Sequence, residues 1–92
     1  MSPTTVTHNA AAQRFELTVD GLLCEATYRL NEGVMWMNHT GVPPALEGRG
    51  LASQLVAAAV AHARQHGLKI KPVCSYVAVW MRRHPETADL LA

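Results

Sequence analysis

The segment Glu47-Gly48-Arg49-Gly50-Leu51-Ala52 decides the fold, because two glycines separated by one residue stand where a strand ends and a helix begins. The helix is predicted from about Arg49 to His66, a stretch rich in alanine and leucine that Gly67 stops. The first turn of a helix leaves N–H groups unpaired, and these bind phosphate oxygens together with the positive end of the helix dipole. Since glycines let the backbone approach a ligand closely, this segment is predicted to hold a diphosphate.

Two common phosphate motifs do not fit the segment. A Walker loop needs Gly-Lys followed by Ser or Thr, which the chain does not contain. A dinucleotide fingerprint needs a third Gly or Ala three residues after Gly50, where Ser53 stands. An ordinary glycine-rich loop that only caps the helix stays open as the alternative.

Three strands are predicted before this segment. Apolar and polar residues alternate from Arg14 to Val19, and Asp20-Gly21 is a typical two-residue hairpin turn before a second strand at Leu22 to Leu30. A turn at Asn31-Glu32-Gly33 then leads into Val34 to Val42. This third strand starts apolar on both faces, so we expect it in the middle of the sheet. Both tryptophans, Trp36 and Trp80, are interpreted as core residues.

After Gly67, a short strand is predicted at Leu68 to Val73, and Cys74-Ser75 opens a second helix that ends near Pro85. A last helical turn is predicted within Glu86 to Leu91. The order β-β-β-α-β-α indicates an α+β fold of the three-layer type. At the N-terminus, Met1 to Ala12 is expected to fray or to add an edge strand through Val6 to Asn9.

Composition narrows the class of protein. The 92 residues are 49% hydrophobic and 16% charged, which predicts one globular domain over residues 1–92. A formal charge of +1 argues against a nucleic-acid surface. The sequence has no apolar run of about 18 residues and no signal-peptide centre, so we expect a cytoplasmic protein that does not bind a membrane. Cys24 and Cys74 are read as free thiols.

The glycine segment resembles the coenzyme A signature of the GNAT superfamily: Gln or Arg, two residues, Gly, one residue, then Gly or Ala. Gly50 and Ala52 occupy its last two places, and Glu47 replaces the usual Gln or Arg. A closer resemblance, from about Phe15 to Leu90, is to the small stand-alone GNAT-like proteins called minimal or YjdJ-type acetyltransferases. The strings that carry it are His39-Thr40, Val42-Pro43-Pro44, Glu47 to Ala52, His66-Gly67-Leu68-Lys69-Ile70, Pro72-Val73-Cys74-Ser75-Tyr76 and Arg83-His84-Pro85.

The resemblance implies a shortened GNAT, or acyl-CoA N-acyltransferase, fold with a mostly antiparallel sheet. Its central strands, Met37 to Val42 and Ile70 to Val73, would splay apart and hold acetyl-CoA in the gap. The pantetheine arm would bond to the backbone at Thr40, Gly41 and Val42. The pyrophosphate would meet the backbone at Glu47, Gly48, Arg49, Gly50, Leu51 and Ala52.

Three residues are candidates for the chemistry of acetyl transfer. Cys74 is the first choice, because a thiol at a helix N-terminus has its pKa lowered from about 8.5, and the matching cysteine is the suspected catalytic residue of the minimal proteins. It could protonate the coenzyme thiolate or accept the acetyl group; a purely structural cysteine is the alternative. His39 is the candidate base and Tyr76 the third candidate. Relatives often carry Glu where this chain has Gly41.

Other histidines are given structural roles. His62 and His66 are spaced to share a metal ion, but no third ligand accompanies them, so a solvated helix face and no metal are predicted. His84, beside Arg82 and Arg83, is interpreted as a helix end that could contact the adenosine phosphate.

The predicted function is an acetyl-CoA-dependent N-acetyltransferase that acts on a small amine or a protein lysine. A non-catalytic module that binds coenzyme A or acetyl-CoA is the alternative, and an interaction domain with a vestigial cradle is a third. The acceptor amine cannot be read from the sequence. The open groove that the resemblance implies would suit an exposed lysine or a polyamine, and a monomer or weak dimer is expected.

Overall fold

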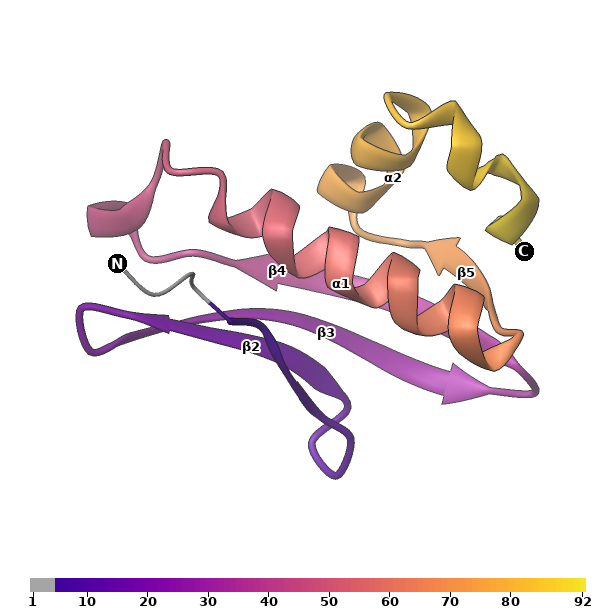
Figure 1. The fold of residues 1–92 in the computed structure, drawn as a ribbon, viewed down its shortest axis with the longest axis horizontal. Coiled ribbons are helices and arrows are strands. Elements are labelled where there is room, and N and C mark those ends of the chain that lie inside the picture. Colours follow the sequence, from indigo (N-terminus) through magenta and orange to yellow (C-terminus); the bar gives the residue numbers. More distant parts are fainter. Residues whose placement is uncertain (1–4) are drawn as a thin grey trace.

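The computed structural model describes residues 5–92, which form a five-stranded sheet with helices packed against it (Figure 1). The chain order confirms the predicted β-β-β-α-β-α arrangement, the expected N-terminal edge strand and the last helical turn, and it adds one short 3-10 helix at Pro44–Leu46. The elements are β1 (Thr7–Asn9), β2 (Arg14–Val19), β3 (Leu22–Asn31), β4 (Val34–Gly41), η1 (Pro44–Leu46), α1 (Leu51–His66), β5 (Lys69–Pro72), α2 (Ser75–Arg82) and η2 (Pro85–Leu90).

The sheet follows the chain, in the order β1-β2-β3-β4-β5, with antiparallel pairs up to β4 and a parallel pair between β4 and β5. Both predicted hairpin turns are confirmed. Asp20 and Gly21 have φ of 52° and 74°, and Glu32 and Gly33 have 50° and 77°. Two successive positive φ values match the twist of antiparallel strands, so these turns set the register of the meander.

The N-terminal edge strand is confirmed at Thr7–Asn9, which pairs with β2. The prediction that Met1 to Ala12 frays falls partly on residues 1–4, which lie outside the described residues. The helices within residues 5–92 are too short or too polar to cross a bilayer.

One face of the sheet carries the core, and α1 crosses in front of it (Figure 1). Cross-strand pairs such as Phe15 with Ala26 and Met35 with Ile70 place the buried strand residues on the same face. Alanines at 59 and 63 of α1 are fully buried and let the helix lie close to the strands. The buried residues of the sheet are Phe15, Leu17, Cys24, Ala26, Tyr28, Met35, Met37 and Ile70, and those of α1 are Leu51, Leu55, Val56, Ala59, Val60 and Ala63.

The other face of the sheet is open, which corrects the placement of Trp36. Trp80 is 9% exposed and is a core residue as predicted, but Trp36 is 40% exposed. Trp36 lies between Arg29 and Lys71 in the register of the sheet and shares their outward direction. The second helix lies beside the first, since the Trp80 indole donates a hydrogen bond to the Ser53 hydroxyl of α1 at 2.8 Å. The core of the described residues thus lies between one face of the sheet and the two helices.

The strands β4 and β5 separate beyond Met37. Their pairing runs from Val34 with Lys69 to Met37 with Pro72, and the Cys74 amide then donates to the Met37 carbonyl at 2.9 Å. From there β4 continues to Gly41 beside β3 alone. The expected splay of the central strands is therefore present, and the end of β4 has a free edge toward β5.

A bulge interrupts β4 just before this free edge. The β3 partners change from Tyr28 with Met37 to Thr27 with His39, so Asn38 is an extra residue. The Thr27 hydroxyl donates to the Asn38 side-chain oxygen at 2.6 Å. An extra residue resets the alternation of side chains, because two consecutive residues then face the same side. Thr40 consequently shares the core face with its partner Ala26, and Gly41 lies on the open face with Glu25.

Candidate active site

The loop before α1 has the backbone conformation that the glycine segment was expected to provide. Gly48 has a φ of 83°, and Gly50, the N-cap of α1, lies in the left-handed region at φ 73° and ψ 19°. The sequence predicted that the helix begins at about Arg49. It begins at Leu51 instead, because the N-cap residue Gly50 has a left-handed conformation. A β-carbon at either glycine would meet nothing within 4 Å, so conformation and not crowding requires glycine here.

The first turn of α1 keeps its amide groups available to a ligand. Gly50 supplies no side-chain cap, and the first helical hydrogen bond recorded at this end is from the Gln54 amide to the Gly50 carbonyl at 3.2 Å. The side chain of Leu51 is buried and anchors the helix, while Gly48, Arg49 and Gly50 are exposed. Backbone N–H groups at a helix start, facing solvent, are suited to an anion.

The remaining predicted cofactor residues lie around this loop. Glu47 is exposed and in extended conformation, and its amide donates to the Pro44 carbonyl at 3.3 Å. The Arg49 guanidinium is 3.4 Å from the Asp20 carboxylate in an exposed ion pair. Val42 packs against the core and Ala52 is half-buried, so both can contribute only backbone groups to a ligand in the gap.

Cys74 and Thr40 meet at the separation of β4 and β5. Cys74 is the N-cap of α2, and its sulfur lies 3.6 Å from the Thr40 hydroxyl oxygen. Burial alone would raise the pKa of the Cys74 thiol. Hydrogen bonds from the Thr40 hydroxyl and from the amides of Val77, Tyr76 and Thr40 outweigh this effect, so the pKa lies below its ordinary value.

Tyr76 lies in the first turn of α2 with its side chain 39% exposed. Its contact with Cys74 is made through its backbone amide, which is one of the groups that lower the thiol pKa. The structure therefore brings Tyr76 to the site and gives its backbone a defined part there.

His39 lies on the other side of the strand from Cys74. Its register partner is Thr27, and a β-carbon built on Gly41 would be 3.1 Å from the His39 Nε2. The same β-carbon would be 3.9 Å from a carboxylate oxygen of Glu25. The three catalytic candidates are therefore divided between two faces, and His39 faces Glu25 and not the thiol.

Sequence reasoning did not single out Glu25. Its strand was predicted correctly, and its outward direction follows from the alternation with Cys24 and Ala26. Its position opposite Gly41 depends on the bulge at Asn38, for which the sequence gives no clear signal.

Comparison with known proteins gives the family. The model of the family described as GCN5-related N-acetyl-transferase matches residues 14–90, which includes the glycine loop, both strands of the gap and Cys74. The chain belongs to the GCN5-related N-acetyltransferase family. A solved structure agrees: the solution structure of a GCN5-like candidate N-acetyltransferase from Staphylococcus aureus has a TM-score of 0.78 and 29% identity, covering 100% of this chain and 91% of that chain.

Family and fold together support an acetyltransferase activity for the chain, and they confirm the α+β GNAT fold. Within that fold, the loop at Gly48 to Leu51 and the gap between β4 and β5 are the parts that the sequence resemblance assigned to acetyl-CoA.

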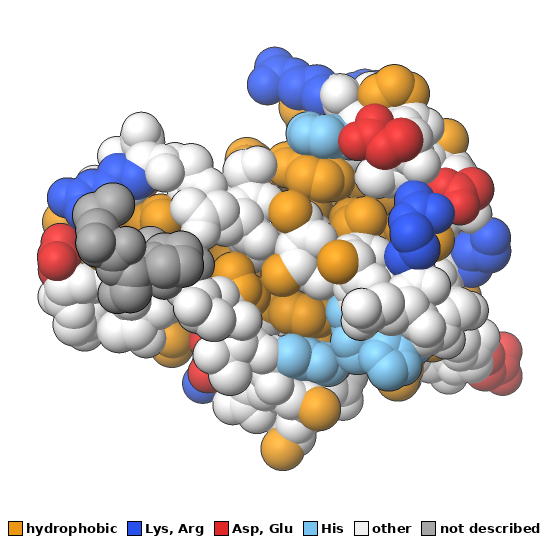
Figure 2. Space-filling view, in the orientation of Figure 1, with side chains coloured by type: hydrophobic (Ala, Val, Ile, Leu, Met, Phe, Trp, Pro, Cys, Tyr) orange, Lys and Arg blue, Asp and Glu red, His pale blue; other side chains and the backbone are white. Residues whose placement is uncertain are grey.

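A histidine cluster lies away from this candidate site. His8 of β1 stacks on Phe15 with ring centroids 4.3 Å apart, and His62 contacts both His8 and His66 at 4.3 Å (Figure 2). Burial, followed by the charges of neighbouring histidines, lowers the pKa of His8 and of His62. His62 is half-buried, which corrects the prediction of a solvated face. Within residues 5–92, no group of three or more His, Cys, Asp or Glu side chains is arranged to hold a metal ion.

His84 is likewise better packed than predicted. It is half-buried and stacks on Trp80 with ring centroids 3.7 Å apart, and its Nδ1 is 2.7 Å from the Trp80 carbonyl oxygen. Its neighbours Arg82 and Arg83 are exposed.

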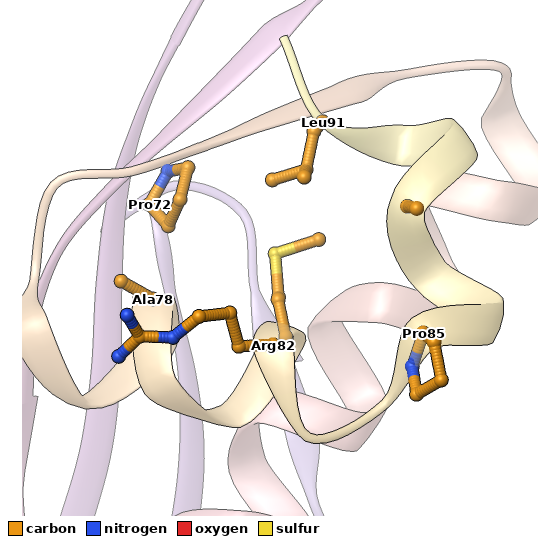
Figure 3. Close-up of a pocket in the computed structure, with 7 residues that line it drawn as sticks. Pro72, Ala78, Arg82, Pro85 and Leu91 are labelled. Atoms are coloured by element: carbon orange, nitrogen blue, oxygen red, sulfur yellow. The ribbon is translucent and has the colours of Figure 1, made fainter.

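An apolar pocket of about 420 Å³ lies between β5, α2 and η2 (Figure 3). Its only charged lining group is Arg82, and neither Cys74 nor the glycine loop reaches it. The pocket is therefore separate from the candidate site at Cys74 and the glycine loop. Its lining residues are Pro72, Ala78, Met81, Arg82, Pro85, Ala88 and Leu91.

Proposed function

We propose that this single-domain protein is an acetyl-CoA-dependent N-acetyltransferase of the small, YjdJ-type subfamily, acting in the cytoplasm on an amine. The observation that carries the proposal is the thiol of Cys74 at the start of α2, 3.6 Å from Thr40 and beside the free end of β4. Family membership supports acetyl transfer in general, and this thiol supplies a specific place for it.

The chain's own groups are suited to bind acetyl-CoA along the gap. The amides from Gly48 to Leu51 would bind the pyrophosphate, because they face solvent at the positive end of the α1 dipole. The free edge of β4 at Thr40 to Val42 would bind the pantetheine amides, as an added strand would. The Glu47 side chain is a carboxylate, which repels a diphosphate, so only backbone N–H groups of the loop would bind the pyrophosphate.

Cys74 is the proposed nucleophile. Its lowered pKa increases the thiolate fraction near neutral pH, which favours attack on the thioester over the donation of a proton. The thiolate forms a bond to the acetyl carbon, the bond between that carbon and the coenzyme sulfur breaks, and coenzyme A leaves as a thiolate. The neutral amine then attacks the acetyl group on Cys74, the bond between the acetyl carbon and the Cys74 sulfur breaks, and the proton that the nitrogen loses passes to the departing Cys74 thiolate or to water.

The alternative, a module that binds coenzyme A without turnover, is favoured by one feature, the absence of a side chain at Gly41, where relatives often carry Glu. Both functions would use the glycine loop and the gap between β4 and β5 to bind coenzyme A. They differ in whether acetyl-CoA acetylates Cys74.

Intact-mass analysis after incubation with acetyl-CoA alone tests the proposal. We expect the wild type and Cys24→Ala to gain one acetyl group and Cys74→Ser to gain none. Cys74→Ser is preferred to alanine because serine is a good helix N-cap. Binding measured by calorimetry without acetylation would identify the non-catalytic module. Absence of binding at millimolar coenzyme A would overturn both functions.

A further inference from the structure

The apolar pocket between β5, α2 and η2 has no part in the steps above. Its volume of about 420 Å³ is in the range of small-molecule sites. Met81 is buried within the lining, while Pro85, Ala88 and Leu91 are exposed around it. The Leu91 side chain is 45% exposed. A ligand in this pocket would remove apolar surface from water, which favours binding.

Hydrogen bonds outside the pocket hold η2, which forms one of its walls. The Arg64 guanidinium of α1 donates to the Asp89 carboxylate at 2.9 Å, and the Lys69 Nζ donates to the Asp89 carbonyl at 2.6 Å. After η2, the Ala92 amide donates to the Ile70 carbonyl of β5 at 2.9 Å. None of these residues lines the pocket. The wall is therefore fixed without a ligand, and binding requires little further ordering of the chain.

The guanidinium of Arg82 is the one charged group of the lining. Ala78 lies one turn before Arg82 on the same face of α2, and the Arg82 side chain runs back toward it in Figure 3. The guanidinium thus lies at the end of the pocket formed by Pro72 and Ala78. The ion pairs within residues 5–92 do not include Arg82, so its charge is available to an anion.

The rest of the lining determines what can accompany that anion. No lining side chain other than Arg82 donates a hydrogen bond, and none is aromatic, so a sugar or a nucleotide base would find no partner. The acidic residues of η2, Glu86 and Asp89, do not line the pocket, and Asp89 is paired with Arg64. The flexible Met81 side chain can adapt to an aliphatic chain. The pocket therefore complements an aliphatic body with a negative charge at one end.

We propose that this pocket binds a medium-chain aliphatic carboxylate, with its chain against Met81, Ala88 and Leu91 and its carboxylate on the Arg82 guanidinium. A guanidinium can bind both oxygens of a carboxylate at once. One lining cation matches the single charge of a monocarboxylate, whereas a phosphate dianion would need a second cation. The binding is non-covalent, so it neither requires nor produces acetyl transfer.

The experiment is a titration of the full chain with sodium octanoate at neutral pH, without coenzyme A. The readout is the NMR signal of the methyl groups of methionine. We expect the Met81 methyl signal to shift and to saturate, because Met81 lines the pocket. The methyl signals of Met35 and Met37, which are buried in the core elsewhere, should stay within a small fraction of that shift. Calorimetry of the same titration gives the Kd.

Two ligand series test the chain and the charge separately. From butanoate to octanoate, each added methylene should tighten the Kd about threefold to fourfold, as burial of a methylene would. Octan-1-ol and octylammonium have the same chain without the negative charge, and both should bind more weakly than octanoate. Octyl phosphate and phosphatidylglycerol vesicles present an aliphatic chain with an anionic phosphate, and they distinguish a membrane lipid from a soluble acid.

Matched variants test the residues. Arg82→Gln should weaken octanoate binding about fivefold, as loss of an exposed ion pair would, and leave octan-1-ol binding unchanged. Arg83→Gln removes the neighbouring exposed cation, which does not line the pocket, and should stay within about twofold of wild type. Ala88→Phe fills the pocket and should abolish the Met81 shift. Ala57→Phe places the same ring on an exposed part of α1 and should leave the shift in place.

Three results would overturn the proposal. Octanoate could leave the Met81 signal unmoved, it could bind Ala88→Phe as tightly as wild type, or it could bind no better than octan-1-ol. Co-sedimentation with phosphatidylglycerol vesicles, without binding of free octanoate, would equally reject a soluble carboxylate. None of these results depends on Cys74 or on coenzyme A, so the proposed function is tested separately.

Discussion

The two sides of the end of β4 differ in what surrounds their polar groups. On the core side, Thr40 and the first turn of α2 enclose Cys74 and lower the pKa of its thiol. On the open side, a β-carbon on Gly41 would be only 3.1 Å from the His39 Nε2, and Glu25 accepts a hydrogen bond from Arg14 at 3.2 Å. Consecutive residues of one strand thus contact a partly desolvated thiol on one face and exposed polar side chains on the other. The reactivity of the thiol depends on the fixed hydrogen bonds of the core side.

The largest expected effect on activity comes from a substitution on the core side of β4. Cys74→Ser should lower amine acetylation by about 100-fold or more, because the proposed nucleophile is removed. Product formation with saturating acetyl-CoA and spermidine measures this. Cys24→Ala, which alters a thiol that is fully buried, controls for loss of a cysteine; comparable activity losses in the two variants would contradict the role of Cys74.

A smaller effect is expected at the diphosphate loop. Gly50→Ala forces alanine into a left-handed conformation, which costs about 1–2 kcal/mol, and it tilts the amides that would bind the pyrophosphate. We expect about a tenfold weaker Kd for coenzyme A by calorimetry. Gly33→Ala is the matched control, because φ at this hairpin glycine is 77°. Both variants should lose similar stability in urea, and a Gly33→Ala protein with equally weak binding would refute the loop assignment.

Thr40→Val isolates the effect of the Thr40 hydroxyl on the Cys74 thiol, since it removes one hydroxyl and keeps the shape of the side chain. The Thr40 hydroxyl lowers the pKa of the Cys74 thiol, so its loss should raise that pKa. The rate of alkylation by iodoacetamide against pH, without any coenzyme, measures the change. Thr40→Ser should restore the wild-type profile, and a profile unaffected by Thr40→Val would rule out the contact as a cause.

The smallest effect is expected far from β4, at the histidine cluster. Burial and neighbouring histidines lower the pKa of His8 and His62 below the ordinary histidine value of 6.5 in the folded protein. The unfolded chain therefore binds protons more readily, so stability is complete above pH 6.5 and falls as pH drops through the lower, folded pKa values. Urea unfolding between neutral and mildly acidic pH should show this slope.

His62→Asn should flatten that slope and leave the iodoacetamide profile of Cys74 as in the wild type. A change in the Cys74 profile would mean that the two ends of the fold are coupled.

The sequence predicted those features that depend on local chemistry. Asp20-Gly21 specified a hairpin, and Gly67 stopped α1 at His66, because both positions need positive φ. The contact of Cys74 with Thr40 was not foreseen, although both residues were candidates, since it depends on where β4 and β5 separate.

The pairing of Glu25 with Gly41 on the open side of β4 was not predicted, for a more specific reason. Counted straight from the pair Asn31 with Val34, Glu25 falls opposite Thr40; the bulge shifts its partner to Gly41. Single-residue irregularities in a strand depend on tertiary packing, so alternation alone does not place them. Trp36 was assigned to the core for a related reason: an apolar run gives no sign of which face stays uncovered.

The extra residue Asn38 has a consequence for how this strand can evolve. If β4 paired with β3 without a bulge, Thr27 would face Asn38 and every later residue would move one place along β3, which would turn the Thr40 hydroxyl outward and Gly41 toward the thiol. Deleting Asn38 would instead give a regular ladder in which His39, Thr40 and Gly41 keep their present partners. The strand can therefore lose this residue without changing the direction of the following side chains, but it cannot lose the bulge while keeping its length.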